Sequence, residues 1–566
     1  MNYFRKCDCN SLNKYINKYI YIYGWIDDKR YINNNCYFIE IRDFYGKIQI
    51  NFNKKNINNN SIFYILKKIK NESCVKIYGF LKNRPIDKIN YEKLNGDLEI
   101  IATNILVINY SDEIPININN FSEKNKLKFR YLYLRKNLNL IKIRSYITYE
   151  IHKFMNKNKF INIETPILSK YLPEGARNYI VNSRIYENKY YSLSQSPQIF
   201  KQILMMSGVN KYYQIARCFR NEDLRSDRQP EFTQLDIEVS FLKSNYIIYI
   251  SEKLIKFLFK KINNINIEKI KKIKFKDSII KYGTDKPDLR NFIELFYINE
   301  IFRINKDINK FINKKIFNKK NKIISFFNLP NININYYKIL ENFNFKNINF
   351  FITNKNKISK FLNKIFNNLF KLNLLKINNN TKYDIFIILI GDKDEIYKNL
   401  LNIRNSLFKE IKMYINNVKT SLIWITNFPM FKEVNNKIEC NHHPFTLPKT
   451  INNIYNINNK KKILSILSNS YDLVLNGFEI ASGSERINNK NIQNTIFDII
   501  NVNKNNEFNF FLEALKYGTP NHSGIAFGLD RLIMLLNNLD NIKEIIPFPK
   551  TSSFKDIMTD SPNKIF

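Results

Sequence analysis

Cysteine is scarce in this chain of 566 residues, which contains only six, and they are scattered. Cys7 and Cys9 lack the paired spacing of a zinc site, and no second cluster follows them. Reduced thiols are therefore expected. The first residues, MNYFRK, lack the apolar segment of a signal peptide, and no apolar run is long enough to span a bilayer. These absences predict a soluble, cytoplasmic protein with no membrane segment.

Stretches of low hydrophobicity are also missing. Hydrophobic residues make up 44% of the chain, and even Asn-rich segments such as 51–60 are interleaved with Ile, Phe and Tyr, which argues against disorder. The length suggests about three or four domains. A formal charge of +40 would ordinarily indicate nucleic-acid binding. Because the same Lys/Asn/Ile bias runs from end to end, as an A+T-rich genome would produce, the charge permits an RNA partner without establishing one.

The N-terminal part reads as short strands with one helix. The helical pattern, 61–70, follows the third of five strand-like segments, which are 19–26, 36–43, 47–52, 74–80 and 98–102. Five strands with a helix after the third predict an OB-type barrel, whose open face binds oligonucleotides. A purely structural barrel is the alternative. Phe38 and Gln49, which stand in an otherwise apolar pattern, favour RNA binding.

The rest of the chain changes character twice. A polar connection at 111–128 precedes a helical pattern at 136–158 and mixed strands and turns to residue 238. Residues 291 to about 418 are rich in Asn, Lys, Ile and Phe and carry no dense charge cluster. Ordered patterning returns near residue 421. We interpret 291–418 as an inserted domain within an α+β multidomain protein.

The segment 219–236, FRNEDLRSDRQPEFTQLD, concentrates charge between apolar flanks. Buried ion pairs seldom repay their desolvation, so such density is better explained by a polyanionic ligand than by stability. A solvated loop is the alternative. Two further segments are informative: 161–166, INIETP, follows the long helix, and 524–536, GIAFGLDRLIMLL, is a Gly-punctuated strand entering a helix. A helix start with Arg531 in its first turn suits a phosphate.

In order and spacing, these three segments resemble motifs 1, 2 and 3 of the class II aminoacyl-tRNA synthetases. Further segments resemble the bacterial-type aspartyl-tRNA synthetases; these are 172–179, 195–202, 281–290, 427–431, 442–446 and 514–520. The resemblance covers nearly the whole chain apart from the insert.

The resemblance implies a fold and a division into domains. The expected parts are an anticodon-binding OB-fold barrel at 1–110, a linker at 111–130, an antiparallel catalytic sheet with helices at 131–290 and 419–566, and the insert of the bacterial type at 291–418. Members of the family are homodimers with motif 1 at the interface, which would put Pro166 there.

The resemblance also implies a two-step reaction. L-Aspartate attacks the α-phosphate of ATP, and the aspartyl group then passes to the 3′ end of tRNA-Asp. Whether tRNA-Asn is charged too remains open. Positioning and charge neutralisation would carry the first step, with Arg220, Glu222 and Arg531 as the catalytic residues. The implied ATP-binding residues are Arg220, Asn221, Glu222, Arg228, Gln229, Glu479, Gly528, Leu529, Asp530 and Arg531, and Asp472 and Glu479 would hold Mg²⁺.

Aspartate and the anticodon have their own implied contacts. Arg486 and Lys201 match the family's pair of cations for the side-chain carboxylate. The implied aspartate-binding set is Glu174, Ser196, Gln198, Lys201, Arg220, Asp236, His442, His443 and Arg486. Phe38 and Gln49, with Glu99 as a weaker third, resemble the barrel residues that contact anticodon bases. A core aromatic and a surface amide are the alternatives.

One segment departs from the family pattern. The family's glycine run appears here as Ala481-Ser482-Gly483-Ser484, whose side chains are expected to crowd the pocket. Two other functions fit the sequence less well. Lysine or asparagine specificity is disfavoured because two cations would repel lysine and an amide could not neutralise them. A tRNA-binding paralogue without catalysis is disfavoured because Arg220, Glu222, Asp472, Glu479 and Arg531 occur together.

Overall fold

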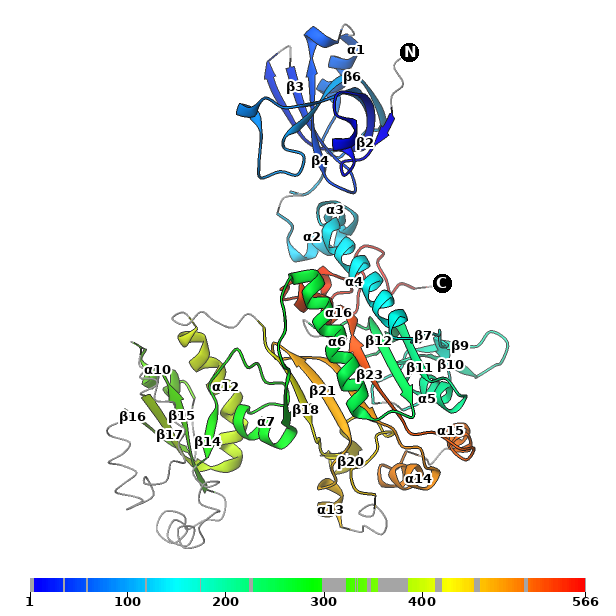
Figure 1. The fold of residues 1–566 in the computed structure, drawn as a ribbon, viewed down its shortest axis with the longest axis vertical. Helices are drawn as coiled ribbons and strands as arrows, with labels where there is room; N and C mark the ends of the chain where they lie inside the picture. The colour runs from blue at the N-terminus through cyan, green and yellow to red at the C-terminus, as the bar shows by residue number, and fades with distance from the viewer. Residues whose placement is uncertain are drawn as a thin grey trace. The chain divides into compact units, whose positions relative to one another are not determined.

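The computed structural model describes most of the chain. The described residues are 5–33, 36–57, 60–117, 120–173, 175–222, 227–297, 322–330, 332, 334–343, 348–354, 385–412, 420–451, 459–502 and 507–564. Residue contacts divide the chain into two units, drawn in Figure 1. The barrel unit comprises Met1–Asn139 and Ile557–Ser561, and the large unit comprises Leu140–Asp556 and Pro562–Phe566.

The barrel unit is a closed six-stranded sheet in the order β1-β2-β3-β4-β6-β5, closed by pairing of β2 with β5. Alternate residues of β3 and β4 point inward, so period-two apolar patterning fills the interior. This confirms the predicted OB-type barrel. Its elements are β1 (Arg5–Cys7), β2 (Tyr19–Asn33), β3 (Cys36–Arg42), β4 (Lys47–Asn53), α1 (Asn60–Lys68), β5 (Cys74–Asn83), β6 (Leu98–Asn109), α2 (Glu123–Lys128) and α3 (Arg130–Lys136).

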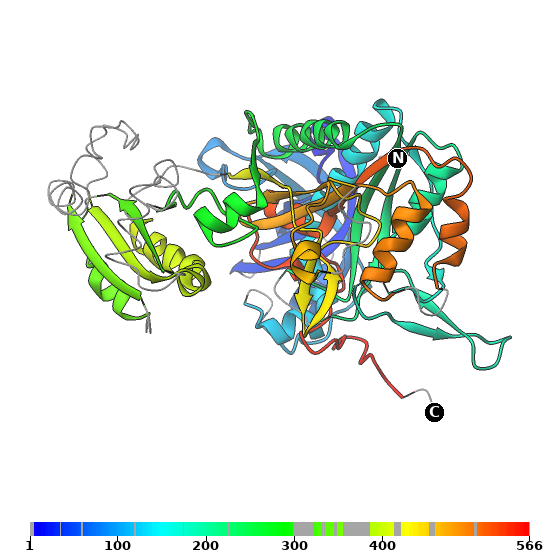
Figure 2. The same ribbon diagram turned by 90° about the horizontal axis from the view of Figure 1, so that it is seen from below.

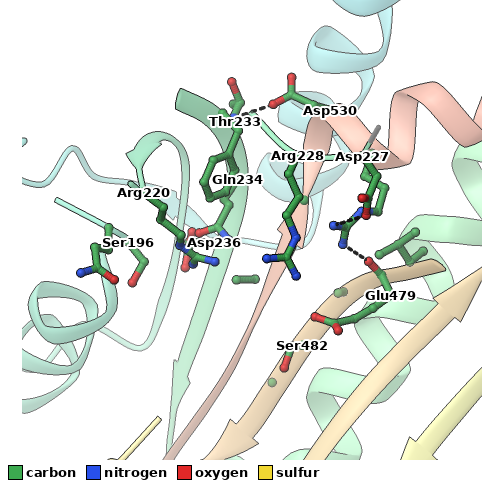
Figure 3. Close-up of a pocket in the computed structure, with 18 of the residues that line it drawn as sticks. Ser196, Arg220, Asp227, Arg228, Thr233, Gln234, Asp236, Glu479, Ser482 and Asp530 are labelled. Atoms are coloured by element: carbon green, nitrogen blue, oxygen red, sulfur yellow. Dashed lines mark hydrogen bonds and ion pairs between the residues drawn. The ribbon is translucent and has the colours of Figure 1, made fainter. Parts of the chain in front are cut away.

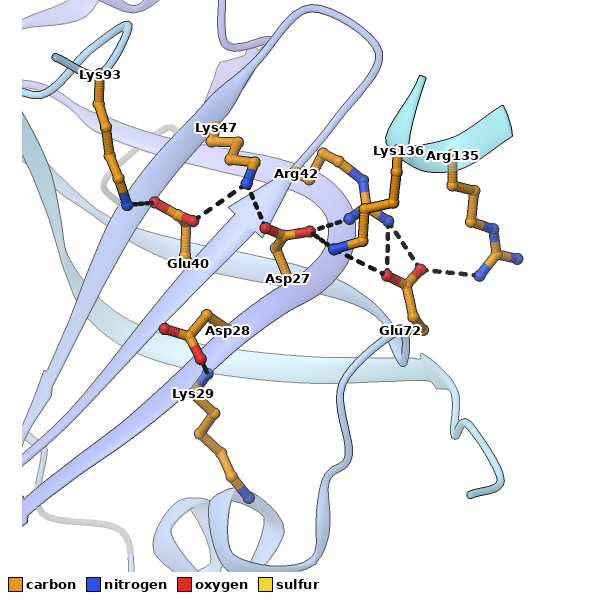
Figure 4. A network of polar contacts seen from close by, with 10 residues as sticks. All are labelled: Asp27, Asp28, Lys29, Glu40, Arg42, Lys47, Glu72, Lys93, Arg135 and Lys136. Atoms are coloured by element: carbon orange, nitrogen blue, oxygen red, sulfur yellow. Dashed lines mark hydrogen bonds and ion pairs between the residues drawn. The ribbon is translucent and has the colours of Figure 1, made fainter. Parts of the chain in front are cut away.

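A network of buried charge ties the barrel to α3, which follows it in sequence (Figure 4). The Glu72 carboxylate accepts hydrogen bonds from Arg42 at 2.8 and 2.9 Å and from Arg135 of α3 at 3.1 Å. Asp27 accepts from Arg42, from Lys47 and, at 2.6 Å, from Lys136 of α3. Two consecutive residues of α3 therefore bond to two carboxylates of the barrel wall.

The large unit is built on an eight-stranded sheet in the order β13-β18-β21-β22-β23-β12-β11-β7. Its six central strands pair antiparallel, and the edge strands β13 and β7 pair parallel to their neighbours. The strands are β7 (Ile161–Asn162), β11 (Lys211–Phe219), β12 (Glu231–Ser240), β13 (Lys271–Lys274), β18 (Leu422–Thr426), β21 (Ser470–Leu475), β22 (Phe478–Glu485) and β23 (His522–Gly528).

Three helices cover one face of this sheet with apolar side chains. They are α4 (Leu138–Lys157), α6 (Ser244–Asn263) and α16 (Leu529–Leu536), of which α4 and α6 are the long helices beside the sheet in Figure 1. Helices α5 (Gln198–Met206), α14 (Lys490–Ile499) and α15 (Asn509–Ala514) share a second core. Smaller elements are β8 (Leu168–Ser169), β9 (Ile180–Asn182), β10 (Tyr190–Leu193), α7 (Phe275–Tyr282), β19 (Phe431–Val434), β20 (Lys437–Cys440) and α13 (Lys460–Leu464).

The predicted insert contains its own antiparallel sheet, β14-β15-β17-β16, backed by α12 (Figure 2). Its described elements are β14 (Leu295–Tyr297), β15 (Lys322–Leu329), α10 (Tyr336–Glu341), β16 (Ile348–Asn354), β17 (Ile385–Asp392) and α12 (Lys393–Ile411). The mixed helices and antiparallel sheets confirm the α+β class. Among the described helices, none combines the length and the apolar character needed to cross a membrane.

Candidate functional site

A cavity of about 610 Å³ lies over the large sheet, on the face turned away from α4 and α6. Figure 3 shows Arg220 and Arg228 reaching over the sheet between Ser196 on one side and Glu479 on the other. The cavity brings together most of the residues predicted from the sequence. Those that line it are Ser196, Gln198, Lys201, Arg220, Glu222, Arg228, Gln229, Asp236, His442, His443, Glu479, Arg486, Gly528, Asp530 and Arg531.

Strand β12 separates the two faces by simple alternation. Leu235, Ile237 and Val239 belong to the apolar core, so the residues between them point to the cavity side. Gln234 and Asp236 line the cavity, and Glu238 continues the row. Because apolar residues alternate with acidic or amide residues along β12, one face of the strand packs into the apolar core and the other face forms the polar floor of the cavity.

The neighbouring strand leaves room above this row because its residues are small. Gly528, Ala526 and Gly524 of β23 pair in register with Gln234, Asp236 and Glu238, respectively. A Cβ atom on Gly524 would lie 1.8 Å from a Glu238 carboxylate oxygen. Glycine is therefore required beside Glu238.

Two buried cations share two buried carboxylates at one end of the cavity. Lys201 Nζ lies 2.7 Å from Asp236 and 3.3 Å from Glu238. Arg486 donates to both Glu238 oxygens, at 2.8 and 3.1 Å, and to Ser484 Oγ at 2.7 Å. Burial opposes ionisation of Glu238, but Arg486 and Lys201 outweigh it and lower its pKa. Both cations are thus held rigidly, at fixed positions, before a ligand arrives.

The pKa values of the two adjacent histidines, His442 and His443, are shifted in opposite directions. Burial, reinforced by Arg486, lowers the pKa of His443 well below its usual value, so the ring is neutral and its Nε2 accepts a hydrogen bond from Arg486. His442 Nε2 lies 3.2 Å from Asp472. Burial disfavours the charged form of His442, but the Asp472 carboxylate prevails and raises the pKa. His443 therefore supports Arg486, and His442 pairs with an acid.

Arginines dominate the other end of the cavity. The Arg220 guanidinium lies 5.0 Å from the centre of the Phe232 ring, a cation–π contact that keeps it extended. Arg228 donates to Glu222 at 2.9 Å. Arg531 bonds to Asp227 at 2.8 Å and to the backbone carbonyl of Glu479.

The amide side chain of Gln229 anchors the backbone next to Arg228 by bonding to Lys550. Its oxygen accepts from the Lys550 N–H at 2.7 Å, and its Nε2 donates to the Lys550 carbonyl at 3.2 Å.

The two predicted metal ligands lie on adjacent strands, Asp472 on β21 and Glu479 on β22. Burial and the charge of Glu479 raise the pKa of Asp472. Burial opposes ionisation of Glu479, but Lys286, 2.8 Å away, outweighs it and lowers the pKa. The described residues contain no cluster of three or more acidic, His or Cys side chains suited to a metal. Two carboxylates whose charges oppose each other do fit Mg²⁺, which takes its other ligands from water and phosphate.

Three described residues predicted to bind ATP or Mg²⁺ do not line the cavity. Leu529 is fully buried in the apolar core, Asp472 contacts His442 at 3.2 Å, and the backbone N–H of Asn221 donates to the Arg177 carbonyl at 3.0 Å. Glu174 falls outside the described residues.

Asp530 lines the cavity but is almost fully buried by its partners. Its carboxylate accepts from the Thr233 N–H at 2.7 Å and from Arg144. It thereby ties α16 to β12.

Sequence reasoning missed several polar residues of the cavity region. Glu238 and Gln234 could have been found, because they stand two residues on either side of Asp236 on one strand. Gln195 lines the cavity and bonds to both backbone groups of Ala176, at 2.8 and 3.2 Å. Lys286 lies in the segment 281–290, which resembles the family, but nothing in that segment shows that this lysine lines the cavity.

The departure at 481–484 does not close the cavity. Ala481 is buried against the apolar core, and its small side chain also lines the cavity. Ser482 lines the cavity and pairs in register with Asp472 on β21 and Ala526 on β23.

The three residues predicted to contact the anticodon lie on neighbouring strands of the barrel unit. Phe38 of β3 is half-buried, and Gln49 of β4 pairs in register with Glu99 of β6. The Glu99 carboxylate is 3.3 Å from Lys82 Nζ. All three residues lie on β3, β4 and β6, which are consecutive in the sheet.

Comparisons with known proteins agree with these features. The family model for tRNA synthetases class II (D, K and N) matches residues 122–552, and that for the OB-fold nucleic acid binding domain matches residues 20–108. The chain is 43% identical to an aspartate–tRNA ligase of Buchnera aphidicola subsp. Baizongia pistaciae, across 98% of this chain and 99% of that protein. It is 40% identical to an aspartate–tRNA(Asp/Asn) ligase of Borreliella burgdorferi, across 99% of this chain and 97% of that protein.

A solved structure shares the fold. Asparaginyl-tRNA synthetase from Pyrococcus horikoshii, in complex with asparaginyl-adenylate, matches with a TM-score of 0.60 at 17% identity. The match covers 97% of this chain and 99% of that one.

Proposed function

The chain belongs to the class II tRNA synthetases of the D, K and N group and, within it, to the aspartate–tRNA ligases, and we propose that it activates L-aspartate with ATP and transfers the aspartyl group to tRNA-Asp. Charged tRNA is used by ribosomes, so the reaction belongs in the cytoplasm. We also propose the domain limits expected from the sequence, with the anticodon-binding barrel at 1–110, the linker at 111–130, the catalytic domain at 131–290 and 419–566, and the insert at 291–418.

One observation supports the choice of amino acid above all. Lys201 and Arg486 are buried cations fixed by Glu238, and both line the cavity. Asp236, beside Lys201, has one carboxylate oxygen that is buried without a partner among the described residues. Two cations suit a side-chain carboxylate, and an unpaired acid oxygen suits an ammonium group. Together they match the charges of aspartate.

The first step needs little proton transfer, since the attacking carboxylate is already a nucleophile. Arg220 would bridge the aspartate α-carboxylate and the α-phosphate, a role for which the planar guanidinium is suited. Glu222, Arg228 and Gln229 would hold the nucleotide, and Arg531 would meet the γ-phosphate. Orientation and neutralisation of negative charge would then lower the barrier.

Asp472 and Glu479 are the proposed Mg²⁺ ligands. The ion would supply charge neutralisation at the phosphates and relieve the repulsion between the two carboxylates. Chelation with EDTA should abolish the first step, and full activity in its presence would contradict this assignment.

The proposed homodimer is supported by exposed apolar side chains in and near motif 1. Ile161, Ile167, Leu168 and Ile180 are each about half exposed, and exposed apolar side chains of this kind are typical of an interface. Ile180→Asp on β9 should produce monomers in sedimentation experiments. An unchanged dimer would exclude this face.

For the tRNA, Phe38, Gln49 and Glu99 are the proposed anticodon contacts. Phe38→Ala should raise the KM for tRNA without altering aspartate-dependent exchange of pyrophosphate into ATP. An unchanged KM would remove Phe38 from the anticodon site. tRNA-Asn is a second candidate substrate, because the Borreliella relative carries both tRNAs in its name.

Two assays test the proposed function. Aspartate-dependent pyrophosphate exchange into ATP tests activation, and its absence with folded protein would leave a tRNA-binding paralogue as the better reading. Charging assays with tRNA-Asp and tRNA-Asn, each with aspartate or asparagine, then identify the substrates. Asparagine charging at the rate of aspartate would overturn the amino-acid assignment.

A further inference from the structure

Lys286 is a cation at the phosphate end of the cavity to which the reaction described above assigns no role. It lines the cavity, and its Nζ lies 2.8 Å from the carboxylate of Glu479, one of the two proposed Mg²⁺ ligands. A charged ammonium therefore sits on a carboxylate that the proposed reaction needs for a metal ion.

The loop that carries Lys286 is tightly held. Gly283 ends α7 in the left-handed conformation, at φ 72°, and the Lys286 N–H donates to Thr284 Oγ1 at 3.1 Å. The Thr284 carbonyl accepts from Ser278 Oγ at 2.7 Å, and the Leu289 N–H donates to Ser421 Oγ at 3.0 Å. The backbone around Lys286 is thus fixed at several points, so the ammonium stays near the cavity.

The insert contributes to this hold. Arg404 of α12 is fully buried and donates to the carbonyls of Tyr282 at 2.9 Å, Asn291 at 3.1 Å and Ile293 at 2.6 Å. A Cβ atom on Gly283 would come within 2.8 Å of the Leu401 backbone nitrogen, so α12 packs directly against the start of the loop. Helix α12 therefore holds the backbone on both sides of the loop, at Tyr282 before it and at Asn291 and Ile293 after it.

We propose that Lys286 is a positioning residue for the polyphosphate of ATP, held in place by the insert. Without nucleotide, its ammonium pairs with Glu479. When a metal ion takes that carboxylate, the ammonium is free to turn to the β- and γ-phosphate oxygens, which become the pyrophosphate leaving group. The inference rests on the proposed function, and it gives the insert a physical link to the active site.

This role predicts opposite effects on two ligands. Lys286→Met removes a competitor for Glu479, so Mn²⁺ alone, followed by electron paramagnetic resonance, should bind the free enzyme roughly tenfold tighter. The same variant lacks a phosphate contact, so a non-hydrolysable ATP analogue with Mg²⁺, measured by calorimetry, should bind roughly tenfold weaker. A merely structural role would weaken both, and that result, or no change in either, would overturn the proposal.

Lys281→Met is the matched control. Lys281 lies near the end of α7, pairs with Glu294 at 3.3 Å and does not line the cavity. Its replacement should leave both affinities unchanged. Lys286→Arg keeps the charge and should bind Mn²⁺ as the parent does, and a gain in Mn²⁺ affinity in this variant would contradict competition for Glu479. The Mn²⁺ measurement involves no turnover, so it tests Lys286 even if aspartate-dependent exchange fails in the parent.

The link to the insert has its own test. Arg404→Lys keeps a buried charge but cannot reach three carbonyls as the guanidinium does. The variant should bind the ATP analogue several-fold more weakly while its affinity for aspartate, measured without nucleotide, stays at the parent value. Loss of both affinities, or of neither, would show that α12 does not act through the loop at Lys286.

Discussion

The barrel unit and the large unit both bury clusters of charge, but they satisfy them differently. In the barrel unit, the Asp27 and Glu72 carboxylates each accept hydrogen bonds from at least two arginine or lysine side chains (Figure 4). Among the described residues, no oxygen of these two carboxylates is buried without a partner.

Around the cavity of the large unit, several buried polar atoms have no partner within the described residues. They are Asp236 Oδ2, Gln198 Nε2, His442 Nδ1 and Arg531 Nε. A buried group left unsatisfied costs about 1–3 kcal/mol, so it is retained where a ligand completes it. In these two clusters, the fully paired charges of the barrel act structurally, whereas the unpaired atoms at the cavity are available to a ligand. Substitutions in the two clusters should separate these roles.

The largest effect is expected for Arg486→Gln in the cavity. The substitution removes a buried cation and leaves Glu238 with Lys201 alone, a loss of about 3–5 kcal/mol for a buried pair. The kcat/KM for aspartate in pyrophosphate exchange should fall by about two to four orders of magnitude, and the preference over asparagine should collapse. Arg217→Gln, on a half-exposed pair with Glu231, is the control and should change little. A variant that still prefers aspartate as strongly as the parent would refute this view of the pocket.

In the barrel, Arg42→Met should reduce stability rather than catalysis. Arg42 is nearly buried and bonds to both Asp27 and Glu72, so its loss should destabilise the barrel unit by about 3–5 kcal/mol. Trp25 of β2 reports on this unit when Trp424 is replaced by Phe, so its fluorescence during urea unfolding gives the measurement. Pyrophosphate exchange should be unchanged. A barrel transition at the parent's urea concentration would mean that the network contributes little.

The comparison also explains what the sequence could reveal. The cavity was predictable where charge or glycine is dense along the chain, as around Arg220 and Gly528. Glu238 was within reach of strand periodicity. The barrel network was not, because Asp27, Arg42, Glu72 and Lys136 lie far apart in the sequence and only strand pairing and α3 bring them together. The segment that carries Lys286 was recognised, but the role of this lysine was missed because its partner, Glu479, is distant in the sequence.

A third prediction concerns pH. Lys136 and Lys47 overcome the effect of burial and lower the pKa of Asp27 from 3.8 to about 2. A carboxylate with a lowered pKa stabilises the folded state above its unfolded pKa and loses that effect as the pH falls through the folded value. Between pH 3.8 and about 2, the barrel unit should therefore lose about 2 kcal/mol from this group. In Asp27→Asn, urea unfolding of the barrel should lack this component of its acid dependence, and an unchanged profile would assign the loss to other carboxylates.

The smallest effect should come from the exposed end of the same network. Lys47 contacts Asp27 and Glu40, but its side chain is 43% exposed, whereas that of Lys136 is 19% exposed. Exposed pairs contribute at most about 1 kcal/mol, since water and salt screen them, so Lys47→Met should barely shift the unfolding of the barrel. Lys136→Met should shift it more, because Asp27 would lose the better-buried partner and α3 one of its two bonds to the barrel. The shifts are measured by Trp25 fluorescence during urea unfolding. Equal shifts for the two variants would show that the contribution of a lysine to the stability of this network does not depend on its solvent exposure.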